Sequence, residues 1–236
     1  MKINCKYILI SISIIRLLSS CNTLEKASLH GLNSGYYKLN SDNIIAQNVY
    51  LDVTDEKIDV YHHINRQPDK KQFLTIPLKT TDSLIFNKMV FKKQSLDFDL
   101  TSILLKYRPS SYGLPAQLTT DLNIALYTGW RHDSYQIIRK KDPLSKSYYK
   151  INNWGYDFGV FAGPGTTLVS PFTTQNNRSD EYNGMIIQGG IAGFIELSMA
   201  SFGFAIGYDY LQSQDRSIWI YQNKPWVGFV VGIALN

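Results

Sequence analysis

The stretch SFGFAIGYDY, residues 201–210, sorts its side chains by size onto the two faces of a strand, because successive side chains of a strand point in opposite directions. One face carries Phe202, Phe204, Ile206, Tyr208 and Tyr210. The other carries Ser201, Gly203, Ala205, Gly207 and Asp209. A face of Gly, Ala and Ser is a poor solvent surface and a good lining for a narrow ring of strands. The bulky face must therefore meet either lipid or a packed core.

The same separation recurs in the segments 121–131, 155–168, 185–199 and 227–235. In each of them most bulky apolar residues share one face, and Phe161, Ile186 and Phe194 are exceptions. Most of the 16 glycines lie between Gly155 and Gly232. Glycine normally weakens a strand, so this concentration indicates close packing or tight curvature.

A continuous apolar face opposite a small or polar one is typical of a membrane β-barrel, which must close because lipid cannot satisfy an open sheet edge. We predict an all-β fold, a small antiparallel meander barrel at the outer membrane; the alternative is a soluble lipocalin-like barrel or sandwich. The sequence shows fewer convincing strands than the about eight that the smallest membrane barrels contain. We expect the N-terminal runs or other protomers to supply the rest. Aromatic residues near strand ends would suit interfacial girdles: Tyr107, Trp130, Trp154, Tyr156, Tyr208, Tyr210, Trp219, Tyr221 and Trp226.

The N-terminal segment MKINCKYILISISIIRLLSS has the pattern of a secretory signal peptide. Two lysines precede an apolar run from Tyr7 to Leu18, which is shorter than the roughly 20 residues of a membrane-spanning helix. The following Leu18-Ser19-Ser20-Cys21 resembles the bacterial lipoprotein signal, and that resemblance implies that Cys21 becomes the lipidated first residue of the mature chain. With Cys5 removed and Cys21 lipidated, no disulfide is expected.

We predict three parts along the chain, namely a signal peptide (1–20), a tether (21–35) and a β-barrel domain (36–236). Within that domain, residues 36–92 hold shorter and more polar strands, predicted at Ala46–Val53, Lys57–Ile64, Phe73–Leu78 and Leu84–Phe91. Residues 93–236 hold long glycine-rich strands.

The sequence lacks the signatures of an enzyme, a metal site or a nucleic-acid-binding protein. The net charge of +5 comes without a dense basic block interleaved with aromatics, so no nucleic-acid partner is expected. His62 and His63 are adjacent and would point to opposite faces of a strand. They therefore cannot easily bind the same zinc ion, which requires clustered ligands. The glycine-rich FAGPGTT lacks the lysine of a phosphate-binding loop. We expect no catalytic residue, no metal and no cofactor.

Charged residues on the small face form a candidate lumen charge network: Asp97, Asp99, Asp121, Arg131, Asp157, Glu196 and Asp209. Carboxylates inside a ring must be paired or hydrated, and Arg131 is the expected counter-charge of a structural network. A cation-attracting pore or a solute site is the alternative.

The segment 155–236, with FGVFAGPGTTLVSP, EYNG, SFGFAIGYDYL and IWIYQNKPWVGFVVGIALN, resembles uncharacterised lipoproteins or outer-membrane β-barrel-like proteins of the Bacteroidota. The resemblance implies a fold and a location at the outer membrane, and it implies no activity. We therefore expect a lipid-anchored outer-membrane β-barrel protein with a structural, binding or pore role. The alternative is a soluble lipid-anchored binding module with an internal pocket. Expected partners are outer-membrane lipid and either an envelope protein or a second copy of the chain.

Overall fold

The computed structural model describes residues 31–41, 44–64, 67–78, 86–143, 147–196 and 201–234. The predicted signal peptide, Cys21 and most of the predicted tether lie outside these residues. Within them the chain forms one antiparallel sheet of eleven strands and contains no α-helix, which confirms the predicted all-β fold. The strands are β1 (Gly35–Ser41), β2 (Ile44–Val53), β3 (Lys57–Ile64), β4 (Gln67–Pro77), β5 (Lys88–Arg108), β6 (Gln117–Thr119), β7 (Ile124–Lys141), β8 (Ser147–Val169), β9 (Tyr182–Glu196), β10 (Ser201–Leu211) and β11 (Pro225–Ala234).

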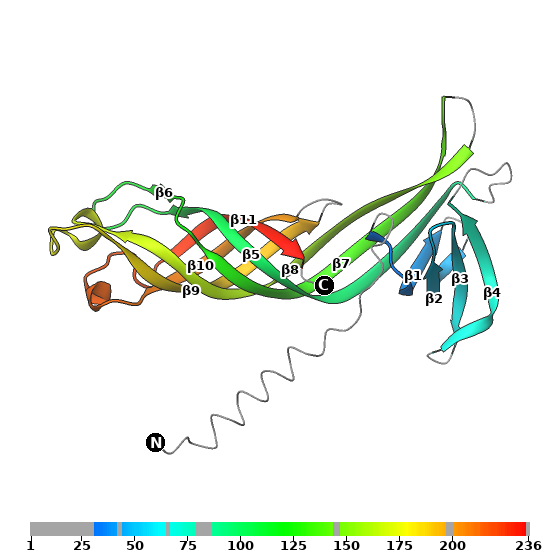
Figure 1. Ribbon diagram of the computed structural model, residues 1–236, viewed down its shortest axis with the longest axis horizontal. Helices are drawn as coiled ribbons and strands as arrows, with labels where there is room; N and C mark the ends of the chain where they lie inside the picture. The colour runs from blue at the N-terminus through cyan, green and yellow to red at the C-terminus, as the bar shows by residue number, and fades with distance from the viewer. Residues whose placement is uncertain are drawn as a thin grey trace, which may run out of the picture.

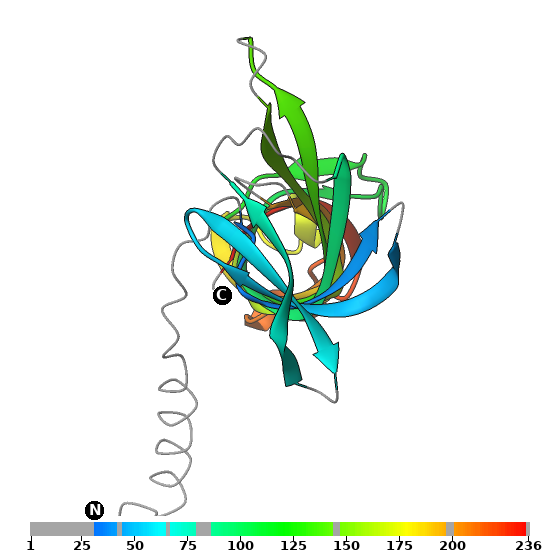
Figure 2. The same ribbon diagram turned by 90° about the vertical axis from the view of Figure 1, so that its right-hand side faces the viewer.

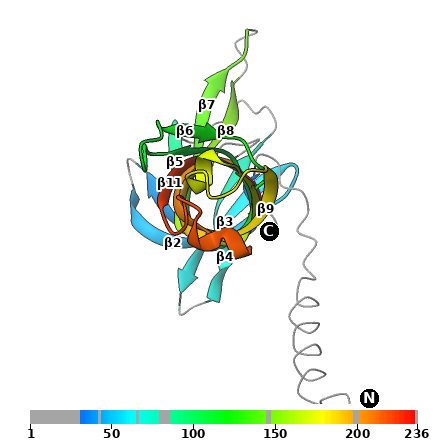
Figure 3. The ribbon, with the colours of Figure 1, turned by 90° about the vertical axis from the view of Figure 1, so that its left-hand side faces the viewer.

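Six of these strands close into a ring, visible end-on in Figure 3. The order is β5, β7, β8, β9, β10, β11 and back to β5, with each neighbouring pair antiparallel. The closing pair runs from Val227 opposite Tyr107 to Ala234 opposite Asp99. Strand β6 pairs with β5 beside the ring.

The other four strands, β1–β4, lie outside the ring (Figures 1 and 2). This corrects the expectation that the N-terminal runs would complete it. The reason lies in β5, whose 21 residues serve two partners along one edge. Its residues 90–92 pair with β1, whereas its residues 99–107 pair with β11. The predicted run Leu84–Phe91 leads into this long strand.

Strands β7 and β8 are also long, with 18 and 23 residues, and they run beyond the ring beside β5. We call β1–β4, together with residues 88–95, 131–141 and 147–153, the head sheet. A core of Leu39, Leu51, Ile58, Phe91 and Ile137, each with no exposed surface, lies on one face of it. The head sheet thus has an ordinary apolar core of its own.

The ring has the opposite arrangement, as strand β10 demonstrates. Its residues alternate between buried and exposed along its whole length, with Gly207 and Asp209 inside and Phe204 and Ile206 outside. This confirms the separation of faces predicted for residues 201–210. Phe161, Ile186 and Phe194, the exceptions to the pattern, are buried.

Gly207 illustrates why the inner face consists of small residues. A Cβ atom at this position would lie 2.6 Å from Cζ2 of Trp226 and 2.9 Å from Cζ of Phe161. Each distance is well below a normal carbon–carbon contact. The interior of the six-stranded ring is narrow. It accommodates large side chains such as Trp226 and Phe161 only because neighbouring inner positions such as Gly207 have no side chain.

The predicted aromatic girdle is wrong for three of its members. Trp219, Tyr221 and Trp226 are buried, with 2%, 3% and 0% of their surface exposed. Trp226 faces the ring interior because it occupies the same face of β11 as Gly228 and Val230. The remaining members are exposed, namely Tyr107, Trp130, Trp154, Tyr156, Tyr208 and Tyr210.

Candidate functional site

Two groups of charged residues occupy the ring interior, one near each end. At the head end, β9 stops at Glu196, β10 begins at Ser201, and β11 runs to Ala234. At the loop end the strands are joined by residues 109–123, 170–181 and 212–224, which include the short 3-10 helices η2 (Phe172–Thr174) and η3 (Gln214–Ser217).

The head-end cluster consists of five buried carboxylates around one arginine: Asp97, Asp99, Asp133, Asp157, Glu196 and Arg131. The guanidinium of Arg131 lies 3.3 Å from Oδ2 of Asp97, 3.0 Å from Oδ2 of Asp133 and 3.5 Å from Oε2 of Glu196. Arg131 is 19% exposed, whereas none of its three partners exceeds 6%. One cation therefore joins carboxylates from β5, β7 and β9.

Hydroxyl groups satisfy further oxygens of this cluster. Tyr127 donates its hydroxyl proton to Oδ1 of Asp157 over 2.5 Å, and Ser201 donates to Oε2 of Glu196 over 2.6 Å. The second carboxylate oxygen of each of these two residues, Oδ2 of Asp157 and Oε1 of Glu196, is buried and accepts no hydrogen bond from the described residues. One oxygen from each of Asp97, Asp99, Asp157 and Glu196 lies within 4.8 Å of the others, a spacing that a metal ion could bridge.

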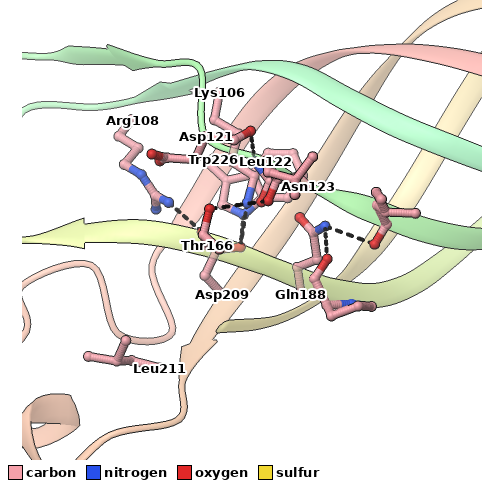
Figure 4. A network of polar contacts seen from close by, with 12 residues as sticks. Lys106, Arg108, Asp121, Leu122, Asn123, Thr166, Gln188, Asp209, Leu211 and Trp226 are labelled. Carbon is pink, nitrogen blue, oxygen red and sulfur yellow. Dashed lines mark hydrogen bonds and ion pairs between the residues drawn. The ribbon is translucent and has the colours of Figure 1, made fainter. Parts of the chain in front are cut away.

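The loop-end cluster, drawn in Figure 4, centres on Asp209. Oδ1 of Asp209 accepts hydrogen bonds from Nζ of Lys106 and from Nε1 of Trp226, both over 2.9 Å. Oδ2 pairs with the guanidinium of Arg108. None of these side chains is more than 2% exposed. Two cations therefore share one fully buried carboxylate.

Rings of aromatic residues stack on these cations. Nζ of Lys106 lies 4.6 Å from the ring centre of Trp226, and the guanidinium of Arg108 lies 4.9 Å from that of Tyr221. Such contacts stabilise a desolvated cation. They explain why Trp226 and Tyr221 are inside the molecule and not at its surface.

Between the two clusters the interior is apolar. Tyr127, Phe161, Phe194, Trp226 and Val230 belong to one buried group with Ile103 and three alanines. Tyr127 contacts Phe194 edge-to-face, with 4.9 Å between ring centres. A second buried group, which includes Leu211 and Trp219, packs at the loop end. Side chains thus fill the middle of the ring.

The structure divides the predicted charge network between the two ends. Asp97, Asp99, Arg131, Asp157 and Glu196 come together at the head end. Asp209 lies at the loop end, and half-buried Asp121 lies on the loop-end side (Figure 4).

The sequence pattern did not point to Lys106, Arg108 or Asp133. Asp133 follows Arg131 by two residues on β7, so the period of two could have found it. Lys106 and Arg108 stand at odd spacing from Asp97 and Asp99, and they face inward because the pairing register of β5 shifts between Ile103 and Leu105. His62 and His63 contact different rings, Phe73 and Tyr36 respectively.

No family model, no curated protein and no solved structure matches the chain. Within the described residues, no helix has the length and apolar character needed to cross a membrane.

Proposed function

We propose that the six-stranded ring is a β-barrel inserted in the outer membrane, where it anchors and presents the head sheet. One observation carries this proposal: the outer face of the ring is apolar and exposed, whereas its charged residues are buried inside. Buried charges occupy both ends of its interior. Its outer face carries exposed Leu96, Phe98, Leu100, Leu104, Ile124, Leu126, Trp130, Phe158, Val160, Leu168, Met185, Ile187, Ile191, Ile195, Phe202, Phe204, Ile206 and Val227.

A continuous exposed apolar surface of this kind is costly in water and marks contact with another apolar phase. In the described spans 96–107, 124–130, 154–168, 185–195 and 202–210, no exposed side chain is charged. Lipid is the partner that fits an apolar band around the whole ring. A protein partner would cover only one side of it.

The apolar band has a sharp boundary toward the head sheet. Along β5, exposed Lys88 and Lys92 give way to exposed Leu96 and Phe98. Along β8, exposed Lys150 gives way to exposed Trp154 and further apolar residues. Lysine belongs in the aqueous phase, so the change supports a membrane surface between residues 92 and 96 of β5.

Strand length supports the same arrangement. A tilted strand crosses the hydrocarbon core with about 9–11 residues. Strand β10 has 11 residues and β11 has 10. The three long strands β5, β7 and β8 exceed that length because they continue into the head sheet.

An anchor is favoured over a pore, and over the alternative of a soluble binding module with an internal pocket. Both of those functions need space inside the ring. The level of Tyr127, Phe161, Phe194 and Trp226 is instead filled by packed side chains. The head sheet then offers the surface for an envelope partner or a second copy of the chain.

The proposed lipid on Cys21 suits this orientation. Leu32, only eleven positions further along the chain, is buried in the core of the head sheet. Eleven residues span at most about 36–40 Å. The lipid would therefore insert into the leaflet next to the head sheet, as a second attachment on the same side.

Fluorescence quenching by brominated lipid tests the insertion. Trp130 is 65% exposed on the outer face, whereas Trp219 is 2% exposed. A Cys21→Ser protein reconstituted into bilayers that contain bromine-labelled acyl chains should lose tryptophan emission. Trp130→Phe should remove much of that quenching, and the matched control Trp219→Phe should not. A Cys21→Ser protein that remains monomeric without detergent and is not quenched would refute the proposal.

A further inference from the structure

We infer that the head-end cluster is a binding site for a divalent cation of the calcium class, held by Asp97, Asp99, Asp157 and Glu196. This inference concerns the ring interior and does not rest on membrane insertion.

The four carboxylates bring potential ligand atoms unusually close together. The four carboxylates come from three strands, β5, β8 and β9, yet one oxygen of each lies within 4.8 Å of the others. Like charges so close in a buried site repel strongly unless a positive charge lies between them. Calcium accepts six to eight oxygen ligands at about 2.3–2.6 Å in flexible geometry. Four carboxylates, each able to bind through one or two oxygens, match that demand.

Two buried oxygens of the cluster also lack a hydrogen-bond partner among the described residues. Oδ2 of Asp157 and Oε1 of Glu196 accept no hydrogen bond from the described residues, although the side chains are only 2% and 5% exposed. A buried carboxylate oxygen without a partner is costly. A cation in the cluster would satisfy both.

Charge balance also favours a cation in the cluster. Asp97, Asp133 and Glu196 contact Arg131, and Asp157 contacts the neutral hydroxyl of Tyr127. The three carboxylates that contact Arg131 already outnumber the single positive charge of its guanidinium, and Asp157 adds a further acidic group to the cluster. A divalent ion offsets most of the excess, and it fits the oxygen-only chemistry better than zinc or copper, which prefer nitrogen and sulfur.

Water reaches the cluster at Arg131, its most exposed member. The ligands lie where β9 ends and where β5 and β8 continue into the head sheet. A bound ion would clamp these strands together at the point where the ring stops.

Isothermal titration of the detergent-solubilised, EDTA-treated protein with CaCl₂ up to about 10⁻³ M, the range of extracellular calcium sites, tests the inference. We expect one site per chain and a higher melting temperature in CaCl₂ than in EDTA. Asp157→Asn and Glu196→Gln keep the hydrogen bonds to Tyr127 and Ser201 but remove ligand charge, and each should weaken calcium binding at least tenfold.

The control Asp180→Asn removes a carboxylate that is 66% exposed and distant from the cluster, and it should leave binding unchanged. Absence of heat and of a thermal shift with the wild-type protein would overturn the inference, leaving protons as the charges that neutralise the cluster. Equal binding by wild type and both cluster variants would overturn it as well, because the calcium would then bind elsewhere. Folding of the variants is checked by their circular dichroism in EDTA.

Discussion

Nζ of Lys106 lies 2.9 Å from Oδ1 of Asp209, and the two side chains are 1% and 0% exposed. A lysine and an aspartate so fully removed from water are stable only as a pair with further hydrogen bonds. Trp226 and Arg108 supply those bonds. The pair fixes β5 against β10 across the ring interior, although the two strands are not neighbours in the ring.

Asp209→Asn should destabilise the protein severely. It removes the carboxylate that Lys106 and Arg108 share, and breaking a buried pair costs about 3–5 kcal/mol. The free energy of unfolding in detergent, measured by urea titration, is the readout. The matched control Asp215→Asn removes a carboxylate that pairs with the partly exposed Arg178, and it should cost less than about 1 kcal/mol. A loss for Asp209→Asn no larger than for the control would contradict the buried-pair account.

Arg131→Leu should destabilise the head end of the ring by about 3 kcal/mol at neutral pH, because Asp97, Asp133 and Glu196 lose their shared cation. Thermal unfolding at neutral pH checks this, with Arg131→Lys as the variant that keeps the charge and should lose less stability. A loss for Arg131→Lys as large as that for Arg131→Leu would exclude the proposed role of Arg131 as counter-charge.

Gly207→Leu should prevent the ring from closing, since even its Cβ would overlap Trp226 and Phe161. Ile206→Leu, one position away on the outer face, should be tolerated. Heat-modifiable migration in detergent gels and resistance to proteolysis report the folded ring. Normal folding of Gly207→Leu would show that the interior is wider than the packing of Trp226 implies.

The head sheet should lose stability in acid through Asp59. Burial raises the pKa of this carboxyl, but hydrogen bonds from Lys57 and Thr75 outweigh it and hold the pKa below the ordinary 3.8. A lowered folded-state pKa stabilises the fold above the unfolded-state pKa, and this stabilisation disappears as the pH falls through the folded-state value. The hydrogen-exchange protection factors of β3 and β4 amides, which correct for the intrinsic pH dependence of exchange, should thus fall below about pH 4. Asp59→Asn should lower these protection factors at neutral pH and remove most of their acid dependence.

Cys21→Ser should abolish incorporation of a labelled fatty acid and leave the precursor uncleaved by the lipoprotein signal peptidase. Cys21 lies outside the described residues, so this prediction depends on the Leu18-Ser19-Ser20-Cys21 sequence alone. Cys5→Ser is the control and should be labelled normally. Equal labelling of the Cys21 variant would exclude the lipoprotein assignment.

The alternation along residues 201–210 predicted strand β10 and its two faces, because a strand has a period of two that any single segment displays. The number of strands in the ring was not predictable in the same way. It depends on β5 changing partner from β1 to β11, and no local pattern in residues 88–108 encodes that change. The division of the predicted charge network into two clusters could not be predicted either. Asp97 and Asp209 share the inner face, but their heights in the ring depend on register.

The position of Trp226 illustrates a further limit of prediction from the sequence. An aromatic residue near the end of an apolar strand suits both an interfacial girdle and an interior position, and the sequence pattern is the same for both. The cations that distinguish the two cases, Lys106 and Arg108, lie more than a hundred positions earlier in the chain.

The closing pair of the ring also determines how the chain must fold. Thr101 donates its hydroxyl proton to the backbone carbonyl of Val231, 130 positions away, whereas every other neighbouring pair in the ring follows directly along the chain apart from the short β6. Contacts between such distant positions form slowly, because the chain must lose the entropy of a long loop first. Until they form, β5 and β11 each have an unpaired edge, which a bilayer does not tolerate. At the proposed outer-membrane location, insertion and closure of the ring should therefore be a single concerted event, completed when β11 pairs with β5.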